Sequence, residues 1–403
     1  MGIARKILLV VLDGASDRPI GGRTPLQMAE TPNLDLIARG GINGIMDPIA
    51  PGIRPGSDVA HLALLGYDPY EVYTGRGPLE AAGVGIRLKE GDVAFRCNFA
   101  TMKDGIIVDR RAGRIRDTAE LAKAIQKGVN LDAELIFKKS TGHRAAMVLR
   151  GKGLSPHVTA SDPKHEGMHA RKVDALRPEA ERTANILNEF IEQAEKILET
   201  HPLNIERKRA GKPPANVILI RGAGTVQKIE TFSEKYGLTG AVIAATGLVI
   251  GIGRMYELDC IGMEGATGGV DSDVDAQVKN AIGALEDHDF VLLNIKGADE
   301  SGHDGLIEEK IQFIGKIDKA LEPIIGLKDM LVVVTPDHST PIAVRDHSAD
   351  PVPVAITGPG VRVDNVRAYD EISAATGGLS RIRSMDLMPM LMDLIDHTKK
   401  FGA

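Results

Sequence analysis

The chain has no tryptophan and few aromatic residues of any kind. Aromatic residues make up 3% of its 403 residues, which leaves few side chains on which nucleic acid bases could stack. The formal net charge of −6 and the pI near 6.0 also argue against a surface that binds a polyanion. We therefore do not expect nucleic acid as a partner, and any anion that the chain binds should be small.

Cysteine and long apolar segments are equally scarce. Cys97 and Cys260 are too few for a disulfide framework and too far apart for a Cys-x-x-Cys site, so a reducing compartment is the simpler expectation. The apolar run that ends at Leu12 is too short for the core of a signal peptide or for a membrane span. We therefore expect a cytoplasmic protein without a membrane partner.

Short runs of leucine and β-branched residues without polar alternation are typical of strands buried on both faces. Amphipathic helices are predicted beside them, one beginning near Pro178 and another after Gly305. This alternation predicts an α/β fold. The predicted strands cover residues 6–12, 217–220, 290–295, 331–334 and 352–356.

The chain is longer than a single hydrophobic core usually supports, so two domains are expected. The candidate metal ligands fall into two blocks, 13–57 and 299–347, with no candidate ligand in the stretch between them. This indicates an insertion. We predict a catalytic domain formed by residues 1–91 and 269–403, with a smaller α/β domain inserted over residues 92–268.

Carboxylates and imidazoles follow three of the apolar runs. Asp13 and Gly14 follow the first, Asp299 and His303 follow the run 290–295, and Asp337 and His338 follow the run 331–334, with His347 shortly after. Alone, an Asp-Gly pair is usually a turn, and a single histidine is usually a surface residue. Because ligand sites of open α/β sheets lie beyond the carboxyl ends of strands, their recurrence favours a shared metal site. The predicted ligands are Asp13, Asp299, His303, Asp337, His338 and His347.

Ser57 follows Pro55-Gly56 and precedes an apolar helical run that ends at Gly66. A serine at such a position is most often a helix N-cap. The same position directs main-chain N–H groups at a bound phosphate, which suits a serine that becomes phosphorylated. Because the pKa of a serine hydroxyl is far above neutral, a metal bound to its oxygen would have to activate it.

Oxygen and nitrogen ligands without thiolates suit Mn²⁺, Zn²⁺, Co²⁺ or Mg²⁺, and the imidazoles argue against a site for Mg²⁺ alone. Two such ions about 4 Å apart can hold the attacking and leaving oxygens of a phosphoryl group. The pattern therefore predicts a phosphoryl-transfer enzyme with two divalent metal ions.

Together these segments resemble the signature of the alkaline phosphatase superfamily. More closely, the chain is similar over nearly its full length to the archaeal-type 2,3-bisphosphoglycerate-independent phosphoglycerate mutases. The superfamily likeness lies in Val-Leu-Asp-Gly (11–14), Pro-Gly-Ser-Asp (55–58), Asp-Glu-Ser-Gly-His (299–303), Pro-Asp-His-Ser (336–339) and Asp-His-Ser (346–348). The likeness to the mutases lies in Arg-Arg-Ala-Gly-Arg-Ile (110–115), Gly-His-Arg (142–144) and Arg-Gly-Ala-Gly (221–224).

The resemblance implies a mostly parallel sheet flanked by helices and a division of the ligands between two metals. It also implies a ping-pong reaction: Ser57 takes the phosphoryl group of 3-phosphoglycerate, the glycerate reorients, and its 2-hydroxyl takes the group back. No 2,3-bisphosphoglycerate is then needed in this step of glycolysis and gluconeogenesis. One ion would be held by Asp299, His303 and His347, and the other by Asp13, Ser57, Asp337 and His338.

The inserted domain is expected to retain the glycerate between the two transfers. Arginines suit this role because they make planar, bidentate contacts with a carboxylate. Asp162 is the candidate proton acceptor for the glycerate hydroxyl, and Lys296 is a candidate neighbour of the phosphate. Exclusion of water would keep the enzyme from acting as a phosphatase. The candidate arginines are Arg111, Arg114, Arg144 and Arg221.

Alternatives to a mutase remain at this stage. A phosphatase, or another phosphomutase such as one acting on pentose phosphates, would use the same metal residues. A sulfatase is disfavoured, because Ser57 lacks a Cys/Ser-x-Pro-x-Arg context. An alternative of another class is a metal-stabilised binding protein without catalysis. The sequence also leaves the formation of a homo-oligomer open.

Overall fold

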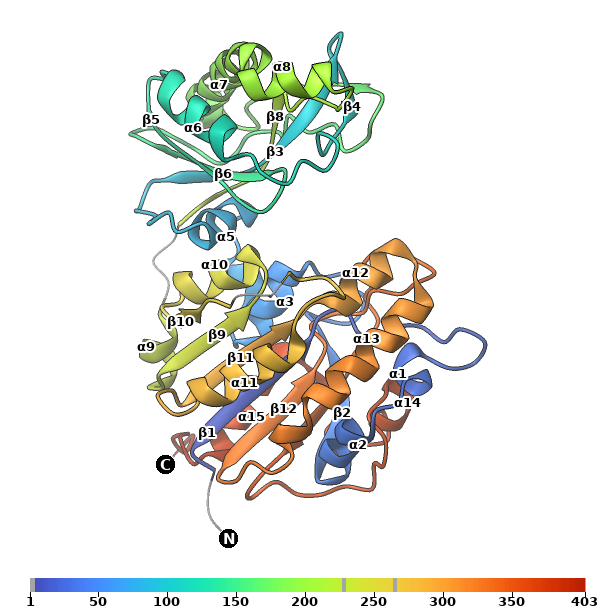
Figure 1. The fold of residues 1–403 in the computed structure, drawn as a ribbon. Coiled ribbons are helices and arrows are strands. Elements are labelled where there is room, and N and C mark those ends of the chain that lie inside the picture. The colour runs from blue at the N-terminus through green and yellow to red at the C-terminus, as the bar shows by residue number, and fades with distance from the viewer. Residues whose placement is uncertain (1–3, 227–229, 264–266, 403) are drawn as a thin grey trace. The chain divides into compact units, whose positions relative to one another are not determined.

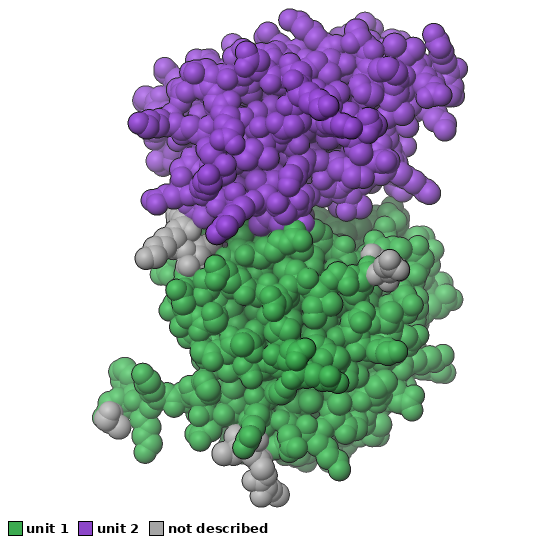
Figure 2. All heavy atoms as spheres, turned by 60° about the vertical axis from the view of Figure 1, so that its left-hand side comes forward, with its two compact units in different colours: residues 1–72, 230–403 green, residues 73–229 purple. Residues whose placement is uncertain are grey.

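The computed structural model describes residues 4–226, 230–263 and 267–402. The chain divides into two compact units, which Figure 2 shows in different colours. Unit 1 consists of residues 1–72 and 230–403, and unit 2 consists of residues 73–229. Each unit has its own sheet. The insertion predicted from the sequence is thus present, but with different boundaries.

Unit 1 is built on an eight-stranded sheet, in which β13 alone runs opposite to its neighbours among the described strands. This confirms the prediction of a mostly parallel sheet. In sheet order, the strands are β10 (Asp259–Ile261), β9 (Gly240–Ala244), β11 (Phe290–Ile295), β1 (Lys6–Leu12), β12 (Met330–Thr335), β13 (Val352–Thr357), β2 (Gly41–Asp47) and β14 (Ser380–Arg383).

Helices cover both faces of this sheet (Figure 1). Helices α2, α11 and α13 pack in one apolar core with alternate residues of β1 and β11, and α3 contacts α10 and α15 on the other face. The helices are α1 (Pro25–Met28), α2 (Pro32–Arg39), α3 (Ser57–Leu64), α4 (Pro69–Val72), α9 (Phe232–Tyr236), α10 (Gly247–Met255), α11 (Val274–Ala284), α12 (Gly297–Asp304), α13 (Ile307–Ala320), α14 (Glu371–Ala374), α15 (Ser384–Leu394) and the 3₁₀ turn Glu322–Ile324.

The central strands position the site. β1 pairs in parallel with β11 on one side and with β12 on the other. All three are almost wholly buried, as the unbroken apolar runs predicted. Because parallel neighbours end at the same edge, the segments after Leu12, Ile295 and Thr335 emerge side by side. These are the segments that carry the predicted metal ligands.

Unit 2 contains a sheet whose described strand pairs are all antiparallel. One face packs on α6 and α7, and the other packs on α5. The strands are β3 (Val93–Lys103), β4 (Ile106–Asp109), β5 (Glu134–Lys139), β6 (Arg144–Arg150), β7 (Met168–His169) and β8 (Val217–Thr225). The helices are α5 (Arg76–Gly83), α6 (Ala119–Gly128), α7 (Glu181–Thr200), α8 (Pro202–Arg209) and the 3₁₀ turn Pro178–Ala180.

The predicted boundaries of the insertion, 92 and 268, need correction at both ends. The segment 240–261 forms β9, α10 and β10, and β9 pairs in parallel with β11 of unit 1. Helix α5 packs its apolar side on β3 and β6, so unit 2 begins before it. Both segments carry no metal ligand, so ligand spacing could not assign them. No helix in the described part of the chain is long and apolar enough to cross a membrane.

Candidate active site

Residues predicted as metal ligands converge in unit 1 in two groups. In each group the candidate ligand atoms lie within 4.8 Å of one another. The first ligand group is Asp299, His303 and His347, and the second ligand group is Asp13, Asp337 and His338. The rings of His338 and His347, one from each group, stack with centroids 3.6 Å apart. The two groups are therefore neighbours.

The first ligand group depends on the helical spacing of α12. Asp299 and His303 are four residues apart and share one face of this helix, so His303 Nε2 lies 3.4 Å from Asp299 Oδ1. His347 Nε2 lies at the same distance, 3.4 Å, from that oxygen. Asp299 is buried, whereas the His303 side chain is 39% exposed. The group thus has one open side.

The second ligand group is fully enclosed. Asp13, Asp337 and His338 are 0–1% exposed, and His338 Nε2 lies 3.3 Å from Asp337 Oδ2 and 3.8 Å from Asp13 Oδ1. Gly14 turns the chain away from β1 with a φ of +66°, and a Cβ there would lie 2.6 Å from Asp299 Cβ. Only glycine suits this position.

Hydrogen bonds fix the tautomer of each imidazole. His303 Nδ1 lies 3.1 Å from the carbonyl of Arg345, and His347 Nδ1 lies 2.9 Å from the carbonyl of Pro55. Because a carbonyl only accepts, each Nδ1 carries the proton. Nε2 of each ring is left with its lone pair facing Asp299. Metal-binding histidines are commonly oriented in this way.

Thr340 links the two ligand groups, and sequence reasoning missed it. Its hydroxyl donates to Asp299 Oδ1 at 2.8 Å and lies 3.1 Å from His338 Nδ1. The only hydroxyl proton goes to the carboxylate, so His338 Nδ1 must donate to Thr340 Oγ1. His338 Nε2 therefore also carries a lone pair, which points toward Ser57.

Ser57 is the first residue of α3, and Gly56 is the N-cap. The alternative that Ser57 is an ordinary N-cap is therefore wrong, whereas its predicted place at a helix N-terminus is confirmed. Its side chain is free of a capping bond, and Oγ lies 3.1 Å from His338 Nε2. The serine hydroxyl thus faces the second ligand group, at the positive end of a helix.

Two buried side chains support this arrangement from behind. His61 Nδ1 donates to the carbonyl of Ser57 at 2.8 Å, and its Nε2 accepts from Asn294 Nδ2 at 3.1 Å. Asn294 Nδ2 also donates to Asp13 Oδ2 at 3.0 Å. Sequence reasoning missed both residues because they lie inside α3 and β11. A single polar residue in such an apolar segment gives no sign that it belongs to a site.

Lys296 bridges the carboxylates of both groups. Its ammonium contacts Asp13 Oδ1 at 3.2 Å and also donates to Asp299 Oδ2. Burial disfavours the charge of Lys296, but Asp13 and Asp299 outweigh burial and raise its pKa. Burial and the charge of Asp13 raise the pKa of Asp337, so this carboxyl group lacks a sufficient counter-charge.

The donor set fits divalent cations. Asp337 Oδ2, Asn294 Oδ1 and Ser339 Oγ are buried without a hydrogen-bond partner among the described residues. Such orphaned acceptors are costly in an enclosed site unless something else pairs with them. Carboxylate oxygens and imidazole lone pairs converge here without thiolates, which matches Mn²⁺, Zn²⁺ or Co²⁺ better than Mg²⁺ alone.

A second polar site lies on the face of the unit 2 sheet that packs against α5. Strand register places Arg96 opposite Arg221 and Asn98 opposite Arg144. Arg96 and Asn98 are two residues apart, so all four lie on one face. The buried atoms Arg96 Nε, Asn98 Oδ1 and Arg221 Nε have no hydrogen-bond partner among the described residues. This face thus presents two unpaired N–H donors and one unpaired acceptor.

Positive charge is concentrated at this site. Burial and the charges of Arg144, Arg111, Arg96 and Arg221 together lower the pKa of His143 to about 4. We refer to these four arginines as the arginine cluster. Burial and Arg76 likewise lower the pKa of Arg96 to about 9, against the opposing charge of Glu80. The cluster therefore has an excess of cations that a bound anion would relieve.

The structure brings together three of the four predicted arginines, Arg111, Arg144 and Arg221, and adds Arg96, which sequence reasoning missed. Arg114 is exposed in a turn with a φ of 52°, and no described contact joins it to the cluster. Asp162 is 1% exposed, and both its oxygens accept hydrogen bonds from Arg110, at 3.0 and 2.7 Å. Burial opposes ionisation of Asp162, but the bonds from Arg110 prevail and lower its pKa.

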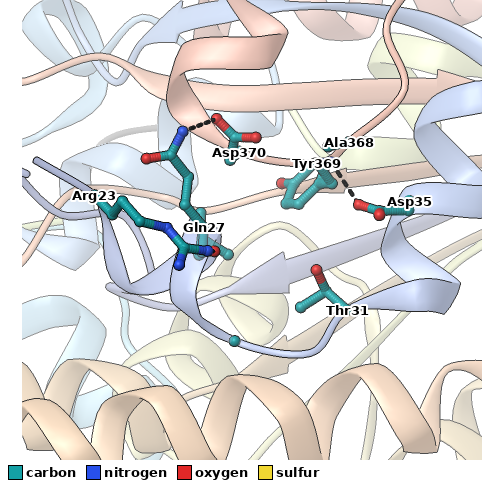
Figure 3. A pocket seen from close by; sticks show the side chains of 9 residues that line it. Arg23, Gln27, Thr31, Asp35, Ala368, Tyr369 and Asp370 are labelled. Atoms are coloured by element: carbon teal, nitrogen blue, oxygen red, sulfur yellow. Dashed lines mark hydrogen bonds between the residues drawn. The ribbon is translucent and has the colours of Figure 1, made fainter.

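A pocket of about 280 Å³ lies elsewhere in unit 1 (Figure 3). It is lined by the ends of α1 and α2 and by residues 368–370, and none of the predicted site residues lines it. Its polar groups largely satisfy one another: Gln27 Nε2 donates to Asp370 Oδ1 at 3.1 Å, and the main chain of Tyr369 donates to Asp35 Oδ1 at 2.9 Å. It offers no group suited to the predicted chemistry.

Comparisons with known proteins agree with the resemblance seen in the sequence. A family model described as 2,3-bisphosphoglycerate-independent phosphoglycerate mutase matches residues 38–204. The chain is 54% identical over 410 residues to the 2,3-bisphosphoglycerate-independent phosphoglycerate mutase of Methanoculleus marisnigri, with 100% of both chains covered. It is 53% identical to such a mutase of Methanothermobacter thermautotrophicus, covering 99% of this chain and 100% of that one.

Solved structures show the same fold. A protein from Pyrococcus horikoshii superposes with a TM-score of 0.88 at 40% identity, covering 100% of both chains. A cofactor-independent phosphoglycerate mutase from Thermoplasma acidophilum superposes with a TM-score of 0.72 at 40% identity, covering 97% of this chain and 100% of that chain. The likeness to its relatives extends over the whole chain, and the chain belongs to the family of 2,3-bisphosphoglycerate-independent phosphoglycerate mutases.

Proposed function

We propose that this chain interconverts 3-phosphoglycerate and 2-phosphoglycerate without 2,3-bisphosphoglycerate, as a step of glycolysis and gluconeogenesis. The observation that carries the mechanism is the position of the Ser57 hydroxyl, 3.1 Å from the lone pair of His338 Nε2 and at the N-terminus of α3. The names of relatives more than 50% identical over the full chain support the reaction.

In this proposal, Ser57 Oγ attacks phosphorus while the bond from phosphorus to the 3-oxygen of glycerate breaks. The proton that Ser57 gives up is balanced by the proton that the 3-oxygen gains. In the second half, the 2-hydroxyl attacks the phosphoserine and the serine regains a proton. Because the 2-hydroxyl, and not water, attacks the phosphoserine, no phosphate is released.

The two ligand groups would each hold one divalent cation, with Ser57 as a further ligand beside the second group. Bound cations would lower the pKa of the serine hydroxyl and offset the charge of the phosphoryl oxygens. Lys296 would contact the phosphate, since its ammonium already lies between Asp13 and Asp299. Manganese is the ion we would test first, because the imidazoles disfavour a purely Mg²⁺ site.

The arginine cluster would bind the carboxylate of glycerate and retain it while the phosphoryl group is on Ser57. Its unpaired N–H donors and excess positive charge support this role. The earlier roles of Arg114 in binding and of Asp162 as proton acceptor stay predictions. Asp162 is engaged by Arg110 on both oxygens, and this pairing suits a residue that holds an arginine in place. A cytoplasmic location is also proposed, supported by the scarcity of cysteine.

Replacement of the nucleophile tests the function. Ser57→Ala should reduce mutase turnover by roughly 10⁴-fold or more, the scale of losing a covalent nucleophile, without loss of Mn²⁺ from the protein. Mass spectrometry of the parent quenched during turnover should show phosphate on Ser57. The control is Ser301→Ala, which removes another buried hydroxyl that only bonds the carbonyl of Gly297 within α12. Rapid phosphate release by the parent with little 2-phosphoglycerate would instead identify a phosphatase.

A further inference from the structure

Lys310 is a fully buried lysine that the proposed reaction does not use. It lies on α13 and is 0% exposed. All three N–H bonds of its ammonium can be accounted for: it donates to Asp17 Oδ2 at 2.8 Å, to the carbonyl of Thr340 at 2.9 Å and to the carbonyl of Ser16 at 3.2 Å. A lysine ammonium has three donors, so this cage leaves none unsatisfied.

The three acceptors belong to two loops. Ser16 and Asp17 follow Asp13 of the second ligand group, and Thr340 follows Asp337 and His338 of the same group. The loops also bond each other directly, since Thr340 N donates to the carbonyl of Ser16 at 3.2 Å. Lys310 is therefore a single rigid point of attachment for both segments.

A second layer holds Asp17 itself. Its carboxylate accepts from the main chain of Ile342 at 3.1 Å, and its main-chain N–H donates to Glu371 Oε1 at 2.9 Å. Glu371 is in turn held by the hydroxyls of Ser16 and Thr24. Asp17, the charged partner of Lys310, is thus held by residues from two other segments of unit 1.

Stability alone does not account for such a cage. A buried ion pair contributes little compared with apolar residues of similar volume, because desolvation offsets the attraction, whereas it can specify one geometry. Here the buried ion pair specifies the position of Thr340, which contacts both ligand groups. The main chain of Thr340 is fixed by Lys310, and its hydroxyl sets the orientation of both Asp299 and His338.

We propose that Lys310 is a positioning residue of the two-cation centre, which acts by holding loops 13–17 and 337–342 in the arrangement that presents both ligand groups. It touches neither the cations nor the substrate. The effect of Lys310 on metal binding rests on the proposed two-cation centre, whereas its effect on the two loops does not.

The test compares two lysines of the same helix. Lys310→Met removes the ammonium and keeps an unbranched apolar side chain. Lys316→Met is the matched control, because Lys316 also donates to two main-chain carbonyls, those of Val270 and Ser272, away from the ligand groups. In the metal-free protein, Lys310→Met should speed amide hydrogen exchange at 13–17 and 337–342 by about 10-fold or more. Lys316→Met should leave both loops unchanged.

Binding of Mn²⁺, measured by calorimetry, gives the second readout. Lys310→Met should weaken binding by about 10-fold to 100-fold, the usual range for groups behind the ligands, and Lys316→Met should not. Unchanged exchange in both loops, or unchanged Mn²⁺ affinity, would overturn the proposal. Failure of the parent itself to bind Mn²⁺ would overturn the proposed centre, and loop exchange would still decide the role of Lys310.

A second variant covers the case in which Lys310→Met does not fold, since it leaves the Asp17 carboxylate buried without its partner. Lys310→Met combined with Asp17→Asn removes both charges and keeps a side-chain carbonyl for Ile342 N. The same loss of loop protection and Mn²⁺ affinity is expected. A double variant with the parent's affinity and exchange would show that the cage is dispensable.

Discussion

The two units hold polar sites of opposite character. In unit 1, Asp13, Asp299 and Asp337 are buried together, and Lys296 is the cation that contacts two of them. In unit 2, Arg96, Arg144 and Arg221 share one sheet face, where Glu80 contacts Arg96 and Asp162 contacts Arg221. One site has an excess of negative charge and the other has an excess of positive charge. In the proposed function, a ligand of the opposite charge would complete each site.

The sites also differ in how they are built. The ligand groups of unit 1 come from segments that follow parallel strands, with Asp299 and His303 in helix α12 and the other ligands in loops. Three members of the arginine cluster, Arg96, Arg144 and Arg221, lie in antiparallel strands and are placed by cross-strand register. Loops can be tightened or loosened by their supports, whereas residues in a strand interior are fixed by the sheet.

The largest effect should follow from breaking the anionic site. Asp337→Asn should lower both Mn²⁺ affinity, by on the order of 10²-fold or more, and turnover, since Asp337 Oδ2 has no hydrogen-bond partner among the described residues. The melting temperature of the metal-free protein should not fall, because a buried carboxyl group with a raised pKa is replaced by a neutral one. Asp318→Asn is the control, an equally buried aspartate that bonds Leu34 N. Unchanged Mn²⁺ occupancy in Asp337→Asn would contradict the ligand assignment.

A smaller effect is expected from the cationic site. Arg144→Ala should raise KM for 3-phosphoglycerate by roughly 10-fold to 100-fold, the value of a hydrogen bond to a charged group. It should also raise phosphate release relative to mutase flux, because glycerate escapes before the second transfer. Arg114→Ala serves as comparison, since Arg114 has no described contact with the cluster, and should change KM by about twofold at most. An equal effect of both variants would show that membership of the cluster is not what matters.

Removal of the Thr340 hydroxyl, which joins the two ligand groups, should have a smaller effect that is confined to the metal site. Thr340→Val keeps the shape of the side chain but removes the bonds to Asp299 and His338. We expect Mn²⁺ affinity to fall by about 10-fold, as followed by calorimetry. Thr335→Val, which removes another buried hydroxyl at the end of β12, should leave affinity unaltered. Equal affinities for Thr340→Val and the parent would refute this role of the Thr340 hydroxyl.

The smallest effect is expected on the pKa of His143. The pKa of His143 is lowered to about 4 by burial and by the arginine cluster. The folded state therefore binds fewer protons than the unfolded state between pH 6.5 and about 4, so His143 contributes a loss of stability as pH falls through that window. An anion in the cluster should raise the pKa of His143, and NMR titration with and without 3-phosphoglycerate measures this. No shift at saturating ligand would place the anion elsewhere.

The sequence predicted one of these sites better than the other. Asp13, Asp299 and Asp337 each follow an apolar run, so strand ends alone brought them together. Arg96 was missed because its partner Arg221 is set by register between strands far apart in sequence, which no local pattern records.

The residues that hold the site from other segments were missed for a different reason. Lys310 and His61 lie in helices whose apolar periodicity is otherwise regular, and their function depends on acceptors supplied by other segments. The boundary at 268 was wrong because β9 and β10 carry no ligand, although β9 pairs with β11, which does lead into one.

The ammonium of Lys296 gives the ligand groups a counterion that is part of the polypeptide. Its single positive charge is shared by two of the three clustered acids, so their mutual repulsion is already reduced before an ion from solution binds. Folding and metal loading can then be consecutive events. A newly made molecule would reach its final shape first and acquire its metals afterwards.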